Sequence, residues 1–191
     1  MGNSLYEGFV FLISSIFDLY LFILVVRLVL VWAGANWFDP ITQFIVKVTN
    51  FIITPLRRMI PNVGKLELAT LFLILALEAI KFCATSLMSV GTPNAIGIFV
   101  LALADTLKLF VQFFFYAILI QVVMSWIQPQ SPMMRVLYQV TSPIMRPVQR
   151  LVPPIGGMDI SPIPAMIGLQ LLLIMLINPL MGLGLGMAFG G

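Results

Sequence analysis

The sequence predicts an all-α membrane protein made of two tandem repeats, each with two transmembrane helices joined by an amphipathic interfacial helix that prolines break. Composition is the first observation behind this prediction: 61% of the residues are hydrophobic, only 9% are charged, and the mean hydropathy is +1.10. Soluble domains carry about 25% charged residues, so an integral membrane protein is the class that fits. The other two observations are an internal repeat and the placement of the basic residues.

A segment containing prolines and arginines occurs twice in the chain. VTNFIITPLRRMIPNVGKLEL at residues 48–68 returns as VTSPIMRPVQRLVPPIGGMDI at residues 140–160, which predicts two units of roughly 92 residues. The matched positions pair Thr49, Pro55, Arg58, Pro61, Gly64 and Glu67 with Thr141, Pro147, Arg150, Pro153, Gly156 and Asp159. We predict a first repeat over residues 9–90 and a second over residues 95–182. The two would be copies of one membrane unit with the same orientation in the membrane, which is called a parallel repeat.

The first predicted span, residues 9–32, contains two charged residues. Asp18 and Arg27 would lie about 13–14 Å apart along a helix axis, too far to pair with each other. We expect Arg27 to extend to the nearby interface, where Trp32 supplies an interfacial aromatic ring. Asp18 lies deeper, and it either packs against a polar group of another helix or faces water inside the assembly. Gln121 takes the place of Arg27 in the second repeat, once the tryptophans that end the two spans are aligned.

Residues 40–60 and 132–152 are predicted to form the two amphipathic helices. Apolar residues recur there at three- and four-residue steps, and basic and other polar residues fall on the opposite side, which is the periodicity of an amphipathic helix. Pro55 in the first helix, and Pro143 and Pro147 in the second, predict a kink or a break. A cationic polar face favours a position in the membrane interface. A docking groove for partner membrane proteins and a re-entrant segment lining a pore are the alternatives.

The three further predicted spans cover residues 66–88, 96–127 and 162–180. Two of them carry an acid and a base at positions i and i+3 on one helix face: Glu78 with Lys81, and Asp105 with Lys108. Such neighbours can neutralise each other inside a membrane. The start of the third span, residues 96–104, either extends that helix or lies at the outer surface. The glycine-rich tail after the last span is predicted to be poorly ordered.

Most of the ten basic residues lie in the two long loops that join the paired spans. They are Lys47, Arg57, Arg58, Lys65, Arg135, Arg146 and Arg150. The N-terminal tail, the short link between the repeats and the C-terminal tail contain no lysine or arginine. The positive-inside rule therefore predicts that both long loops are cytoplasmic and that both termini lie on the outer side of the membrane.

The residue types argue against an enzyme. The chain has no histidine and a single cysteine, Cys83, which removes the commonest general base and the usual nucleophile–histidine pairs. No glycine-rich phosphate loop, CxxC or HExxH motif is present. Glu67 and Asp159 occupy equivalent ends of the two repeats, and we interpret each as starting the next helix rather than as a catalytic pair. We expect no cofactor, no metal and, because the basic segments hold few aromatic residues, no nucleic acid.

The doubled arrangement of threonine, prolines and arginines, each copy followed by a glycine and an acid, resembles the YggT family of bacterial and plastid membrane proteins. The residues that carry the resemblance are Val48-Thr49, residues 54–61, Gly64, residues 141–153, Gly156-Gly157, Asp159, Ser161-Pro162 and the tryptophan-ended stretches 28–32 and 123–126. The resemblance covers residues 19–178. It implies a multi-pass protein of the bacterial inner membrane, with relatives linked to membrane-protein or cytochrome assembly, to membrane organisation at cell division, and to osmotic tolerance. A cytochrome role is not carried over, because the chain offers no histidine as a haem ligand.

Two functional hypotheses follow. The first is a non-enzymatic membrane-organisation or membrane-protein assembly factor, whose partners are anionic lipid headgroups, other membrane proteins and a second copy of the chain. Its anchors would be Lys47, Arg57, Arg58, Arg135, Arg146 and Arg150. The second is a small transporter or channel for an ion or osmolyte, because charges at membrane depth are candidates for function. Those charges are Asp18, Glu78, Lys81, Asp105 and Lys108.

Overall fold

The computed structural model describes residues 2–35, 39–89, 93–154 and 159–189; residue 90, where the first repeat is predicted to end, and the glycine pair at 156–157 lie outside them. Across the described residues the regular structure is helical, apart from an isolated β-bridge between Val63 and Leu66. The helices are α1 (Gly2–Ala33), α2 (Pro40–Met59), α3 (Leu68–Ser89), α4 (Ala95–Ile127), α5 (Pro132–Leu151), α6 (Pro162–Leu172), the π-helical turn η1 (Leu173–Ile177) and α7 (Asn178–Phe189).

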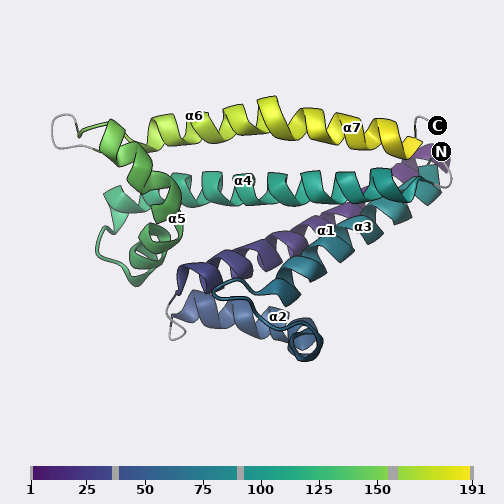
Figure 1. The fold of residues 1–191 in the computed structure, drawn as a ribbon. Helices are drawn as coiled ribbons and strands as arrows, with labels where there is room; N and C mark the ends of the chain where they lie inside the picture. The colour runs from purple at the N-terminus through teal and green to yellow at the C-terminus, as the bar shows by residue number, and fades with distance from the viewer. Residues whose placement is uncertain (1, 36–38, 90–92, 155–158, 190–191) are drawn as a thin grey trace.

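Four helical stretches in the described residues are long and apolar enough to cross a membrane: Glu7–Ala33, Leu68–Ser86, Ala95–Ile127 and Pro162–Phe189. The predicted all-α membrane class with two tandem repeats is confirmed. Helix α4 lies along the continuous α6–α7 helix, while α1 and α3 form a second pair that diverges from it (Figure 1). Helix α4 also packs on α3, α1 and α5, so it is the element shared by both halves.

Helices α2 and α5, the connecting helices, lie at one end of the four long helices, and both chain termini lie at the other end (Figure 1). Each begins at a side-chain cap followed by proline: Asp39 Oδ1 accepts from the Ile41 N–H at 3.1 Å, and Ser131 Oγ accepts from the Met134 N–H at 3.2 Å. Proline suits the first helical position, where its missing N–H costs no hydrogen bond. Helix α2 continues past Pro55, and α5 continues past Pro143 and Pro147, so the prolines break neither helix. The ribbon of α2 does change direction along its length (Figure 1).

The prediction that the last span ends at residue 180, before a poorly ordered tail, is wrong. The helix continues to Phe189, beyond the predicted end of the second repeat at residue 182. It contains one π-helical turn, in which the Asn178 N–H donates to the Leu173 carbonyl. Pro179 follows directly and has no N–H to offer an α-helical turn, which accounts for the irregular hydrogen bonding there.

Glycines in the tail and at the start of α4 explain why this segment is ordered. A Cβ at Gly97 would overlap the backbone nitrogen and Cα of Ala188, and a Cβ at Gly184 would lie 2.9 Å from Leu101 Cγ. Helices in membranes associate through such small residues, because these let the backbones approach closely. The composition that suggested disorder therefore serves tight packing of α7 on α4.

Gly97→Ala is expected to destabilise the protein by about 1–3 kcal/mol, the usual cost of forcing extra atoms into a packed contact. Gly186→Ala is the matched control, because nothing lies within 4 Å of the carbon it adds to α7; it should be neutral or slightly stabilising, since alanine favours a helix over glycine by about 1 kcal/mol. Thermal unfolding of both variants in detergent measures the difference. Equal unfolding temperatures would contradict the close α4–α7 contact.

Candidate functional site

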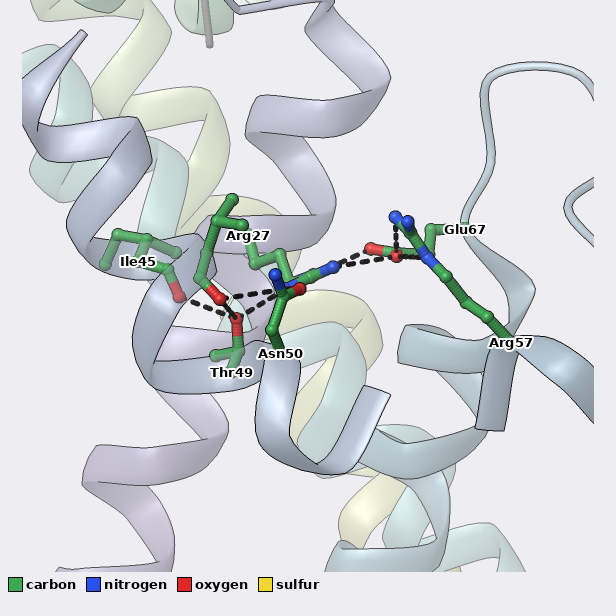
Figure 2. Close-up of polar contacts among 7 residues, drawn as sticks. Arg27, Ile45, Thr49, Asn50, Arg57 and Glu67 are labelled. Carbon is green, nitrogen blue, oxygen red and sulfur yellow. Dashed lines mark hydrogen bonds and ion pairs between the residues drawn. The ribbon is translucent and has the colours of Figure 1, made fainter. Parts of the chain in front are cut away.

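Arg27 of α1 is buried, with only 1% of its surface exposed. Polar side chains of the first repeat surround it. Its Nε lies 2.9 Å from Glu67 Oε2, and its Nη2 lies 3.1 Å from Glu67 Oε1. Its Nη1 donates to Thr49 Oγ1 at 2.7 Å and to Asn50 Oδ1 at 2.8 Å. Figure 2 shows the guanidinium held between Glu67 on one side and the two α2 side chains on the other. The prediction that Arg27 extends to the interface is therefore wrong, because acceptors from α2 and from Glu67, just before α3, bind its guanidinium group inside the protein.

Glu67 immediately precedes α3 and is completely buried. It does start that helix, as predicted, but its carboxylate also pairs with both Arg27 and Arg57. Burial alone would raise the pKa of Glu67, but hydrogen bonding to Arg27 and the positive charges of Arg27 and Arg57 outweigh burial and lower the pKa. Thr49 accepts from Arg27 and donates to the Ile45 carbonyl at 2.6 Å. We call the linked residues Arg27, Thr49, Asn50, Arg57 and Glu67 the arginine network.

The second repeat has contacts at the positions of the arginine network, but it lacks the two positive charges. Thr141 Oγ1 lies 2.5 Å from Oε1 of Gln121, the counterpart of Arg27. Gln149 Nε2, in the place of Arg57, donates to Asp159 Oδ2 at 2.9 Å, and the Ser161 N–H donates to Asp159 Oδ1 at 2.9 Å. Partial burial would raise the pKa of Asp159, but the hydrogen bonds from Ser161 and Gln149 lower it. A neutral glutamine thus replaces each of two arginines.

The charges predicted at membrane depth form one group, the lysine cluster, which joins α1, α3 and α4. Lys81 Nζ lies 2.9 Å from Asp18 Oδ1, 2.7 Å from Glu78 Oε2 and 2.8 Å from Asp105 Oδ2. Lys108 Nζ lies 3.2 Å from Asp105 Oδ1. Of the two alternatives for Asp18, contact with a polar group of another helix is the one observed. The cluster sets three carboxylates against two ammonium groups.

The predicted basic anchors lie on the connecting helices and are exposed. Lys47, Arg57 and Arg58 belong to α2, and Arg135, Arg146 and Arg150 belong to α5. Of these six anchors, only Arg57 forms an ion pair among the described contacts, and its partner is Glu67. No described ion pair links a basic residue of α2 to one of α5. The two helices meet the rest of the protein differently: Gln139 of α5 reaches back to the end of α1, where its Nε2 donates to the Ala33 and Gly34 carbonyls at 2.7 and 2.9 Å.

Sequence reasoning singled out every member of the lysine cluster but missed Arg27 and Glu67 as partners. One feature of the sequence could have indicated that Arg27 and Glu67 are partners: both positions differ between the repeats, with Gln121 in place of Arg27 and Asp159 in place of Glu67. Over the described part of the chain, no group of three or more histidine, cysteine, aspartate or glutamate side chains is arranged to hold a metal ion.

The fold and these clusters define a class: all-helical membrane-type proteins built from two like units, in which polar groups are paired inside an apolar bundle. Within that class, the chain belongs to the CCB3/YggT family, whose model matches residues 6–88 and 100–180. The two matched segments correspond to the two repeats.

Several relatives are similar over most of their length, and all are described as uncharacterised. A Vibrio alginolyticus protein from the proC 3′ region is 40% identical over 163 residues, which cover 84% of this chain and 88% of the relative. YggT of Escherichia coli K12 is 40% identical over 153 residues, or 80% of each chain. A Pseudomonas aeruginosa protein is 32% identical over 175 residues, or 90% of this chain and 89% of the relative. No solved structure matches the chain.

Arg27→Met is expected to destabilise the protein by about 3–5 kcal/mol, because it removes one partner of a buried ion pair and takes the charged donor away from Thr49 and Asn50. Gln121→Met is the matched change in the second repeat and should cost only about 1 kcal/mol, the value of a neutral hydrogen bond. Thermal unfolding in detergent compares the two. A loss at Gln121 as large as that at Arg27 would refute a special role for the charged network.

Proposed function

We propose that this protein is a non-enzymatic membrane-organisation or membrane-protein assembly factor of the bacterial inner membrane, anchored at the cytoplasmic surface by its connecting helices. One observation carries the proposal: α2 and α5 lie at the same end of the bundle (Figure 1), and every charged residue within them is basic and exposed. The absence of a catalytic motif in the sequence agrees with a role in binding.

The exposed surface of the connecting helices suits the membrane interface. Beside their arginines they expose large apolar side chains: Phe51 is 86% exposed, Met59 84% and Leu151 81%. A helix with cationic and apolar faces lies in the plane of the interface with its apolar side among the acyl chains. Each lysine or arginine near an anionic surface contributes about 1 kcal/mol of attraction. We therefore propose anionic headgroups as the first binding partner.

The same arrangement supports an orientation. Lysine and arginine are concentrated at the end that carries α2 and α5, and the positive-inside rule puts that end in the cytoplasm and both termini in the periplasm. We propose other membrane proteins and a second copy of the chain as further partners, contacting the exposed apolar faces of the long helices, such as Phe11 and Ile16 of α1. Support of osmotic tolerance would be a consequence of such membrane organisation.

Neutralising three anchors tests the lipid-binding role. In Arg58→Gln/Arg146→Gln/Arg150→Gln, we expect the preference of the detergent-purified protein for phosphatidylglycerol over phosphatidylcholine to weaken by about a hundredfold, since three attractions of about 1 kcal/mol each are lost. Arg57 is left unchanged because it pairs with Glu67. The control replaces the same three arginines with lysine, which keeps the charge and should keep the preference. Unaltered selectivity in the glutamine variant would contradict the proposal.

A second candidate function, transport of a small ion or osmolyte, is favoured by the lysine cluster. Its unequal numbers of acids and bases leave one negative charge to be balanced by a proton or a cation, and intramembrane charges mark ion pathways by default. If the protein transports, proteoliposomes should show flux of protons, potassium or a compatible osmolyte, and Asp18→Asn and Glu78→Gln should each reduce it. Wild-type flux no higher than that of protein-free liposomes would exclude this function.

A further inference from the structure

A cavity of about 110 Å³ lies in the second repeat, beside the neutral contacts that replace the arginine network. It is bounded by the last turns of α4, by α5 and by the segment that begins α6. The residues that line it are Gln121, Val122, Ser125, Trp126, Tyr138, Asp159 and Pro162. It therefore combines one carboxylate with two aromatic rings and a buried amide.

The sequence repeat pairs the residues that line this cavity with residues around the Arg27 guanidinium group in the first repeat. Gln121 and Asp159 are the counterparts of Arg27 and Glu67, which are in direct contact. Tyr138 is the counterpart of Val46, whose carbonyl lies 3.5 Å from Arg27 Nη1. Glutamine is shorter than arginine, and Gln121 is directed to Thr141 by its contact there. From this correspondence we infer that the cavity lies where the Arg27 guanidinium group lies in the first repeat.

Asp159 lines this cavity and has no cationic partner among the residues that the structure describes. Glu67 receives two arginines, whereas the described contacts of Asp159 are the neutral donors Gln149 Nε2 and the Ser161 N–H. A carboxylate has about four lone-pair positions, so two such bonds leave capacity for further donors. A single carboxylate is a poor site for Mg²⁺ or Ca²⁺, which need six or more oxygen ligands.

The aromatic rings narrow the chemistry of the missing partner. Trp126 and Tyr138 line the cavity together with the carboxylate. A guanidinium group is planar, stacks on aromatic faces and offers parallel N–H donors that match a carboxylate. Few other cations can both stack on aromatic rings and donate parallel N–H groups to a carboxylate. Arg27 supplies a guanidinium group to a carboxylate in the first repeat.

We propose that this cavity binds a guanidinium group, supplied by a small molecule or by the arginine side chain of another polypeptide. The group would donate to Asp159 and lie against Trp126 and Tyr138, in the position that Arg27 holds in the first repeat. This proposal does not depend on the lipid-binding or transport functions above, since it involves none of the exposed anchors or the lysine cluster.

Thermal unfolding of the detergent-purified full chain with millimolar methylguanidinium tests the site. We expect a saturable rise in the unfolding temperature of the wild type, because a ligand that binds only the folded state stabilises it. In Asp159→Asn the apparent dissociation constant should rise about tenfold or more, the effect of losing a charged hydrogen bond. Gln121→Arg should raise the unfolding temperature without added compound and abolish the response, because its own side chain fills the cavity.

Two further arms complete the experiment. Tetramethylammonium has the same charge but no N–H donor, so it should give no saturable rise. N-acetylargininamide carries the guanidinium on a peptide unit: a response to it as strong as to methylguanidinium supports an arginine side chain as the natural occupant, and a response to methylguanidinium alone supports a small molecule. No rise with either guanidinium compound in the wild type, an equal rise with tetramethylammonium, or an unchanged response in Asp159→Asn would overturn the proposal.

Discussion

The contact between Arg27 and Glu67 is the constraint on which the first repeat depends. A charge buried in an apolar bundle is tolerated only when it is paired and its remaining hydrogen-bonding groups are satisfied. Arg27 comes from α1, Glu67 precedes α3, and Thr49 supplies an acceptor from α2. Satisfying one side chain therefore fixes three helices relative to one another, and it explains why Thr49 rather than an aliphatic residue lies on the buried side of α2.

The second repeat shows what happens when that constraint is relaxed. Gln121 and Gln149 make contacts at the positions of two arginines but carry no positive charge. Helix α5 therefore keeps its place although no buried ion pair holds it among the described residues. The exchange also shortens one side chain, and Gln121 and Asp159 both line a cavity in the second repeat. Between the halves, Lys81 gathers acids from α1, α3 and α4, which ties the first pair of long helices to the central helix of the second.

Much of the fold could be predicted from sequence, because long apolar runs and helical periodicity are local signals that a bilayer allows only one way to satisfy. The pairs Glu78–Lys81 and Asp105–Lys108 were visible for the same reason: their spacing lies within one helix. The burial of Arg27 could not be predicted because its partners lie on other segments of the chain. The local sequence around an arginine near a helix end is the same whether its side chain reaches solvent or turns inward. The glycine-rich tail was misjudged because composition does not reveal whether glycines serve flexibility or close packing.

The hydrogen bonds from Gln139 to the Ala33 and Gly34 carbonyls have a dynamic consequence. They join α5 of the second half to the end of α1 in the first, where the long helices otherwise splay apart (Figure 1). Alternating-access machines work by rocking one repeat against the other. Any such rocking here would break both bonds together, at a cost of about 1 kcal/mol each, so this glutamine would act as a weak brake on hinge opening at the connecting-helix end.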